Sequence, residues 1–297
     1  LLQSGHLIVS NRVRTHFSES AYVDDLMNGL SFFDFVCDLV DKKDYDGAGK
    51  KLESVAKKLF AKDRLTANLI AEEDDLPAAE KAIAPFLASF KNLGAEDYAV
   101  AFQPEKVREA FTLNSQVNYI AKGGNFKVLN KSYSGDMAVL ANVISNLYLH
   151  REIRAKGGAY GAGIRIAKSG NVATYSYRDP HVAQTIAAYD GMGDFLRALE
   201  LSDGDLADMI IGVMNTFDPH MAPAAYGILD FKRFLNGTSK EELEALRNQA
   251  LTATVEDLRG YGDMLDALMA EEQMVAMGSE AALKETNAFD RYESLNR

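Results

Sequence analysis

The sequence predicts an α+β fold, in which a mixed and largely antiparallel sheet carries helices on one face. The first observation is a helical period over 140–147, where apolar residues recur at i, i+3, i+4 and i+7. The second is a pair of segments, 160–166 and 172–177, whose alternating pattern and short connection are typical of a hairpin. The third is the order of elements after residue 115, which runs strand, helix, strand, strand, helix, helix and does not alternate like a doubly wound sheet.

Residues 1–95 are expected to be the C-terminal part of one α/β unit. Their first segment, 1–20, is polar with scattered apolar positions and predicts no regular element. Amphipathic periodicity, and a proline near one helix start, predict the elements that follow. These are a helix over 21–40 interrupted at Gly29, helices over 50–60 and 78–90, and a strand over 64–71.

Residues 96–110 are expected to form a linker, at the centre of a wider stretch, 91–115, that combines glycine, proline and mixed charge. A second unit, 111–297, is expected to hold the strands of the predicted sheet and its helices. The elements are strands over 116–121, 160–166, 172–177 and 273–277, and helices over 135–154, 180–199, 206–217, 222–236 and 279–284. Capping sequences beginning at Ser202, Ser239 and Thr254 predict three helix starts.

Composition limits the possible partners. The formal net charge of -11 argues against a nucleic-acid partner, which favours a basic surface. No apolar run approaches the length of a transmembrane helix, so no membrane partner is expected. The single cysteine, Cys37, sits in an apolar run and is expected to be a buried small hydrophobe, which favours an intracellular compartment, either cytoplasm or an organelle matrix. Since residue 1 is Leu and no signal-peptide features follow it, we expect the chain to begin inside a longer protein.

No catalytic metal or nucleotide site can be assembled from the motifs present. The five histidines are not spaced as an H-x-x-E-H or H-E-x-x-H pair, so we predict that this chain binds no metal and no cofactor of its own. The glycine-bearing segment 157–163 follows a helix and precedes a strand, the reverse of the order in a dinucleotide site. The G-x-S-x-G motif of serine hydrolases is also missing.

The segment between the long helix and the hairpin offers the strongest candidate site. Arg154 is expected in the last helical turn, Gly157 and Gly158 at the corner, and Tyr160 at the start of the strand. In a purely structural interpretation, the arginine complements the helix dipole and the tyrosine packs at a sheet edge. In a functional interpretation, Arg154 and Tyr160 donate hydrogen bonds to a peptide, whose backbone the two glycines allow to come close.

Three segments in order carry a family resemblance. They are Ile153–Gly161 (IRAKGGAYG), Ser176–Pro180 (SYRDP) and Gly191–Leu196 (GMGDFL). The chain resembles the C-terminal half of the pitrilysin/insulinase-type zinc metallopeptidases, in the presequence protease (falcilysin-like) branch. The resemblance covers the whole chain and is tightest over 130–240.

The resemblance implies a single polypeptide of four α/β units, arranged as two halves that close around a chamber and degrade unstructured peptides. The zinc site lies in the N-terminal half, so zinc is expected in the full-length enzyme and not in this chain. Residues 1–95 then correspond to the end of the third unit and 111–297 to the fourth. The family's arginine and tyrosine match Arg154 and Tyr160, which implies substrate binding by Arg154 and oxyanion support by Tyr160.

The resemblance leaves a rival open. A catalytically inactive module of the same fold would only clamp peptides or hold a partner. The expected partners are peptide substrates and the N-terminal half of the same protein. An intact H-x-x-E-H upstream of Leu1 would favour the enzyme. Without that half, we expect this chain alone to be inactive, while peptide specificity and oligomeric state stay undetermined.

Overall fold

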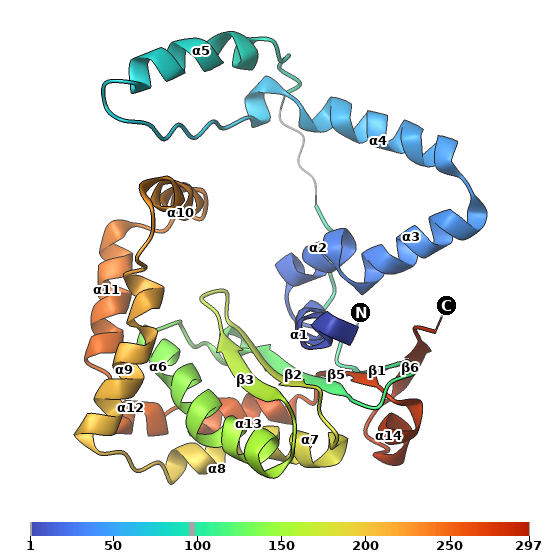
Figure 1. The fold of residues 1–297 in the computed structure, drawn as a ribbon, viewed down its shortest axis with the longest axis vertical. Helices are drawn as coiled ribbons and strands as arrows, with labels where there is room; N and C mark the ends of the chain where they lie inside the picture. The colour runs from blue at the N-terminus through green and yellow to red at the C-terminus, as the bar shows by residue number, and fades with distance from the viewer. Residues whose placement is uncertain (1, 95–98, 297) are drawn as a thin grey trace. The chain divides into compact units, whose positions relative to one another are not determined.

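The computed structural model describes residues 2–94 and 99–296, which divide into two compact units (Figure 1). The first unit contains the described residues of Leu1–Phe32, Ala101–Asp218 and Glu244–Arg297. The second contains those of Phe33–Val100 and Pro219–Leu243.

A mixed six-stranded sheet forms the centre of the first unit, in the order β3-β4-β2-β5-β1-β6. Its strands are β1 (Arg108–Thr112), β2 (Tyr119–Asn125), β3 (Gly161–Ile166), β4 (Asn171–Tyr177), β5 (Met274–Gly278) and β6 (Arg291–Ser294). The pairings β3–β4, β4–β2 and β2–β5 are antiparallel, whereas β5–β1 and β1–β6 are parallel. The sheet is therefore mixed and mostly antiparallel, which confirms the predicted fold class.

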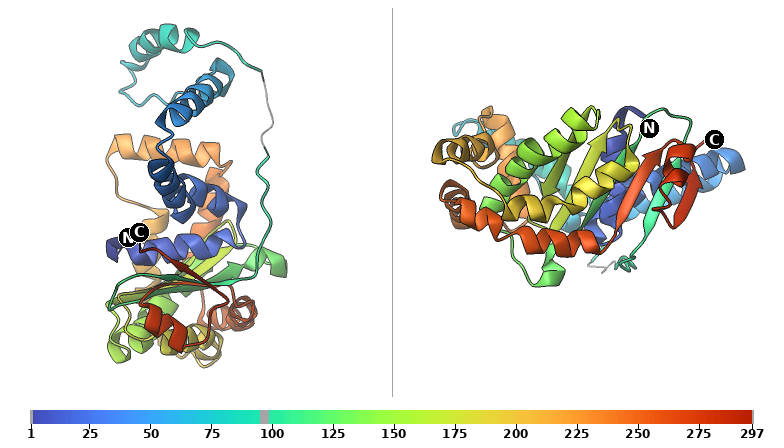
Figure 2. Two further views of the ribbon diagram at one scale, coloured as in Figure 1. Left: turned by 90° about the vertical axis from the view of Figure 1, so that its right-hand side faces the viewer. Right: turned by 90° about the horizontal axis from the view of Figure 1, so that it is seen from below.

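One face of the sheet is covered by helices, of which the sequence predicted all but α13 (Gly262–Ala270) (Figure 2). They are α6 (Asp136–Val143), its continuation η4 (Ile144–Lys156), α7 (Val182–Asp190) and α13 (Gly262–Ala270). Their apolar side chains form the larger core with Ile120, Ile164 and Val172 of the sheet. Since side chains alternate along a strand, Tyr119 and Ala173 point to the opposite face.

That opposite face is covered by α1 (Gly5–Thr15), a helix that the sequence did not predict. Val9 and Val13 of α1 are fully buried in a second, smaller core that includes Phe111 of β1. The expectation that residues 1–20 form no regular element was therefore wrong. The spacing of Val9 and Val13 is the helical signal, and the polar residues around them obscured it.

A buried ion-pair network ties α1 to the sheet. Glu109 of β1 accepts hydrogen bonds from Arg12 (Nε, 2.8 Å; Nη2, 3.0 Å) and from Arg291 of β6 (Nη1, 2.9 Å), and its Oε2 lies 3.1 Å from Nε2 of His16. Arg12 also donates to Asp25 at 3.0 Å. Burial alone would raise the pKa of Glu109, but the hydrogen bonds from His16 and Arg12 outweigh it and hold that pKa well below its usual range.

The remaining helices of the first unit surround this framework. They are η1 (Leu2–Ser4), α2 (Glu19–Asn28), η3 (Phe126–Leu129), α8 (Met192–Arg197), α9 (Asp203–Phe217), α12 (Val255–Arg259) and α14 (Glu280–Glu285), while α11 (Lys240–Leu251) begins in the second unit. The predicted caps are present, because Ser202, Ser239 and Thr254 each accept a hydrogen bond from the backbone three residues on. The predicted helix over 180–199 is interrupted at Gly191, between α7 and α8.

The second unit consists of helices and irregular segments in which few side chains are buried. It contains most of α3 (Leu30–Lys42), with α4 (Tyr45–Leu59), η2 (Lys62–Arg64), α5 (Leu76–Ala88) and α10 (Pro223–Leu235). Among the described residues, α4, α5 and α10 contain no buried residue. The expectation that Cys37 is buried was wrong, since it is only half-buried on a helix whose apolar residues Phe35 and Val40 are exposed.

Two expectations for irregular segments also differ from the structure. The predicted strand over 64–71 is irregular, because no strand lies beside it to complete its hydrogen bonds within the described part of the chain. Asn68 instead donates to the carbonyl of Gly227 on α10 at 3.1 Å. Residues 108–112, placed at the end of the predicted linker, form β1. The assignment of 1–95 and 111–297 to a third and a fourth repeat unit remains a prediction.

Among the described residues, no helix is both long and apolar enough to span a membrane.

Candidate functional site

The candidate site begins on the helix that carries Arg154. The long helix predicted over 135–154 is present but changes character, because α6 continues as the π-helix η4 from Ile144 to Lys156. Within η4, Leu149 and Ile153 are buried, whereas Arg154 is exposed. π-Helical turns are rare and occur frequently at functional sites.

The two glycines form the corner that ends this helix. Gly158 has φ +78°, a conformation that favours glycine, and its N–H donates to the Arg154 carbonyl at 2.9 Å. The N–H of Ala159 donates to the Ile153 carbonyl at 3.1 Å. A Cβ on Gly157 would lie 2.6 Å from that same carbonyl oxygen. The corner itself therefore requires both glycines, and a role in substrate binding stays a prediction.

The corner brings Arg154 and Tyr160 together. The Arg154 Cζ lies 5.8 Å from the centroid of the Tyr160 ring. The backbone N–H of Tyr160 donates to the Tyr177 carbonyl at 2.9 Å, and the two tyrosine rings meet edge-on, with centroids 5.4 Å apart. Tyr160 is 65% exposed. Within residues 2–94 and 99–296, neither its hydroxyl nor the Arg154 guanidinium makes a hydrogen bond or ion pair, so both groups are free to receive a ligand.

Strand β3, which starts at this corner, is an edge strand of the described sheet. Its centre is not open to another strand, because the backbone N–H of Ile164 donates to the hydroxyl of Ser145 on η4 at 3.1 Å. A bound peptide therefore cannot add to β3 through an uninterrupted hydrogen-bond ladder.

A second corner follows β4 and fixes the neighbouring Tyr177. Asp179 is buried, and it accepts hydrogen bonds from the His181 N–H (2.9 Å) and the Thr185 hydroxyl (2.6 Å). The backbones of Asp179 and Asn118 exchange two hydrogen bonds of 2.8 Å. Burial raises the pKa of Asp179. Arg178 has φ +51°, an uncommon conformation for a residue with a side chain. The buried side chain and backbone of Asp179 therefore hold this corner together.

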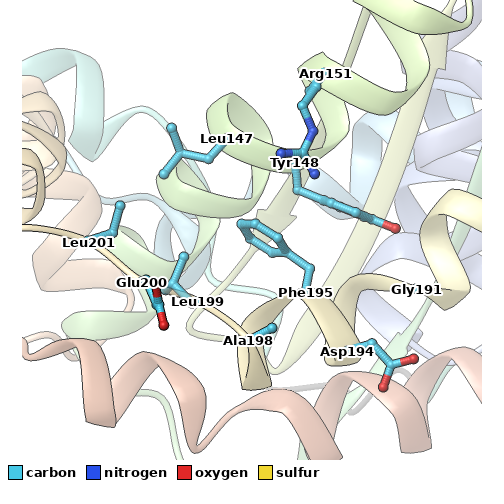
Figure 3. A pocket seen from close by; sticks show the side chains of 10 residues that line it. All are labelled: Leu147, Tyr148, Arg151, Gly191, Asp194, Phe195, Ala198, Leu199, Glu200 and Leu201. Atoms are coloured by element: carbon cyan, nitrogen blue, oxygen red, sulfur yellow. The ribbon is translucent and has the colours of Figure 1, made fainter.

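A separate pocket of about 710 Å³ lies on another side of η4 (Figure 3). It is lined by Leu147, Tyr148, Arg151, Gly191, Asp194, Phe195, Ala198, Leu199, Glu200 and Leu201. The rings of Tyr148 and Phe195 stack in it with centroids 4.8 Å apart, and Arg151 pairs with Glu152 at 2.8 Å. Arg154 and Tyr160 do not line this pocket.

The described residues contain no group of three or more His, Cys, Asp or Glu side chains that could hold a metal ion.

Comparison with known proteins assigns this architecture to a family. Residues 108–280 match the family described as "PreP C-terminal domain". The chain belongs to the PreP C-terminal domain family. This membership confirms the resemblance to the presequence protease branch that the segments at 153–161, 176–180 and 191–196 indicated.

Individual relatives agree with the PreP C-terminal domain assignment. The chain is 30% identical over 288 residues to presequence protease 1, chloroplastic/mitochondrial, of Arabidopsis thaliana, covering 96% of this chain and 27% of that protein. It is 26% identical over 296 residues to protein HypA of Clostridium perfringens, covering 99% of this chain and 30% of that protein. The fold is similar to pitrilysin, with a TM-score of 0.50 at 13% identity, over 75% of this chain and 25% of pitrilysin. The chain thus spans less than a third of the relatives' length.

The sequence located the Arg154–Tyr160 pair of this PreP C-terminal domain but missed its surroundings. Tyr175 and Tyr177 lie on the same face of β4 and extend the aromatic surface from Tyr160, and the ring of His6 of α1 contacts both at a tilt. The alternation of two tyrosines around Ser176 was the available signal.

Proposed function

We propose that this chain is the non-zinc-binding C-terminal part of a metalloendopeptidase that degrades unstructured peptides in a closed chamber. The observation that carries the proposal is the exposed and unpaired Arg154–Tyr160 pair, held at a rigid corner in a domain of the PreP family. An intracellular compartment, either cytoplasm or organelle matrix, forms part of the same proposal.

The proposed chemistry divides the work between this chain and the rest of the protein. A zinc ion held outside this chain would polarise the scissile carbonyl and activate a water molecule. The hydroxyl of Tyr160 would donate a hydrogen bond where negative charge develops on the carbonyl oxygen, so it acts mainly in the transition state. The guanidinium of Arg154 would bind a backbone carbonyl or carboxylate of the substrate in both ground and transition states.

The difference between the two roles gives the first test. In the intact protein, Arg154→Ala should raise KM for an unstructured peptide by roughly tenfold, the effect of losing one charge-assisted hydrogen bond, with little change in kcat. Steady-state kinetics on an internally quenched peptide measure both constants. Arg151→Ala is the matched control, because Arg151 lies on the same helix but is paired with Glu152.

An unchanged KM for Arg154→Ala would remove Arg154 from the substrate site. Peptide binding without any cleavage in the intact protein would instead favour the rival, a catalytically inactive module that only clamps peptides.

A further inference from the structure

Three arginine–tyrosine pairs follow one another along β3 and β4. The Arg154 Cζ lies 5.8 Å from the Tyr160 ring centroid, the Arg178 Cζ 5.5 Å from that of Tyr177, and the Arg165 Cζ 5.6 Å from that of Tyr175. We call these six residues the arginine–tyrosine strip. Only its first pair was predicted from the sequence, and the other two pairs have no part in the proposed mechanism.

The sheet register places three residues of the strip, Arg165, Tyr175 and Tyr177, on one face. Tyr175 and Tyr177 lie two residues apart on β4, so they point the same way, and Arg165 of β3 is opposite Ala173 on that face. Opposite the two tyrosines, β3 has Gly161 and Gly163. A Cβ on Gly163 would meet the Tyr175 hydroxyl at 2.7 Å, so the glycine lets the ring lie across the strand.

The aromatic rings of the strip form a continuous surface. The Tyr160 and Tyr177 rings meet with centroids 5.4 Å apart. The ring of His6 contacts both tyrosine rings of β4, with its centroid 4.7 Å from that of Tyr177 and 5.9 Å from that of Tyr175. The strip lies along β3, whose backbone from Gly161 to Arg165 spans about 13 Å at the usual rise per residue of a strand. This is the length of about four residues of an extended peptide.

The three guanidinium groups carry positive charge that pairs with no carboxylate in the described part of the chain. Over the described residues, none of Arg154, Arg165 and Arg178 forms an ion pair, and all three are exposed, although the side chain of Arg178 also hydrogen-bonds to that of Tyr119. Elsewhere in the chain arginines such as Arg108 and Arg197 each bind two or more carboxylates. In a chain of net charge -11, the strip is therefore a local concentration of positive charge.

The positive charge of the strip also affects the pKa of His6. Its pKa is lowered by burial and, secondly, by the charge of Arg165. An anion bound over the strip would face these guanidinium forks with the tyrosine rings beside them.

We propose that the arginine–tyrosine strip binds the carboxylate groups of an extended peptide, either acidic side chains or a free C-terminus. Guanidinium groups bind carboxylates through paired hydrogen bonds, and the tyrosine faces accommodate the apolar parts of the same peptide. The choice of a peptide rests on the proposed function. The carboxylate preference rests on the three exposed guanidinium groups, which form no ion pair among the described residues, and the geometry therefore adds Arg165 and Arg178 to the substrate-binding residues.

The test is equilibrium binding to the 297-residue chain, measured by fluorescence anisotropy. The probes are four labelled peptides of one unstructured sequence, with Glu or Gln at two internal positions and a free or amidated C-terminus. We expect the Glu peptide with a free C-terminus to bind most tightly. The Gln peptide with an amidated C-terminus should bind roughly tenfold or more weakly, and the two intermediate peptides show which carboxylate is recognised.

The variant arm uses Arg165→Gln combined with Arg178→Gln. This variant should lose roughly tenfold or more in affinity for the preferred peptide and change little for the amidated Gln peptide. The control is Arg247→Gln, which removes an exposed arginine already paired with Asp218 at 2.6 Å. If circular dichroism shows that the change at Arg178 disturbs folding, Arg165→Gln alone carries the test.

Equal affinity for all four peptides, or an unchanged affinity in a folded Arg165→Gln variant, would overturn the carboxylate assignment. Inorganic phosphate that competes as strongly as the carboxylate peptide would reduce the strip to a general anion site and would also overturn it. Because this binding measurement needs neither zinc nor cleavage, its failure is distinguishable from failure of the proposed peptidase function, which appears only as absent cleavage in the intact protein.

Discussion

In the intact protein, Tyr160→Phe is expected to lower kcat by about 10²–10³, the usual effect of removing one donor to an oxyanion. The substitution removes only the hydroxyl and keeps the ring that packs edge-on against Tyr177. KM should change little, because the hydroxyl acts where charge develops and not in the ground state. Steady-state kinetics on an internally quenched peptide provide both constants.

Folding should not be affected by this substitution, since the Tyr160 hydroxyl makes no hydrogen bond within the part of the chain that the structure describes. A thermal unfolding curve equal to that of the unsubstituted protein would establish this. Tyr292→Phe is the matched control, because it removes another tyrosine hydroxyl outside the site. A kcat for Tyr160→Phe equal to that of the control would exclude an oxyanion role.

Of the substitutions considered, Glu109→Ala is expected to lower the free energy of unfolding the most. The carboxylate is buried and accepts hydrogen bonds from Arg12 and Arg291. Its removal leaves these two guanidinium groups without the negative charge that they surround in the folded protein. Breaking a buried ion pair by removing one partner costs about 3–5 kcal/mol. The free energy of unfolding, from denaturant titration at neutral pH, measures this cost. Glu293→Ala on the exposed strand β6 is the control, and an equally small effect of both changes would contradict the assigned role of the network.

The same network predicts a direction for the pH dependence of stability. The pKa of Glu109 in the folded protein lies well below its usual range, so the unfolded chain binds the proton more readily than the folded one. The stability that the carboxylate contributes is therefore fully present above its unfolded pKa, near 4.5, and is lost as the pH falls below it. The difference in unfolding free energy between the unsubstituted chain and Glu109→Ala should accordingly shrink when the titration is repeated at acidic pH.

The helices of this fold could be predicted because their signals are local. Apolar periodicity located helices such as α4 (Tyr45–Leu59), α5 (Leu76–Ala88) and α10 (Pro223–Leu235). Capping residues located three helix starts. Strands β3 and β4 were also predicted, because alternation and a glycine connection lie in adjacent residues.

The elements that were missed depend on partners far away in the sequence. Strand β1 contains Glu109, a charge that argues against a buried strand until Arg12 and Arg291 are known to surround it. Strand β6 is exposed throughout and pairs only with β1 among the described strands. The segment 64–71 has the composition of a strand, but no neighbouring strand completes it.

The candidate site shows the same division. Arg154 and Tyr160 were found because a helix end, a glycine corner and a strand start are consecutive in the sequence. The second and third pairs of the arginine–tyrosine strip were not, since Arg165 and Tyr175 meet only through the register of β3 on β4. His6, which joins two of the rings, comes from a helix more than one hundred residues earlier in the chain.

The hydrogen bond from the Ile164 amide to Ser145 has a consequence for the products of the proposed peptidase. Because that amide is already engaged, a peptide lying over β3 cannot be fixed in one register by continuous backbone pairing. Its position would be set by contacts between its side chains and the arginines of the arginine–tyrosine strip. Because these contacts are similar at each arginine, the peptide would bind in registers that differ by a residue or two from one binding event to the next. Mass spectrometry of the products should then reveal ragged ends at several adjacent bonds, whereas scission at one bond alone would indicate a fixed register.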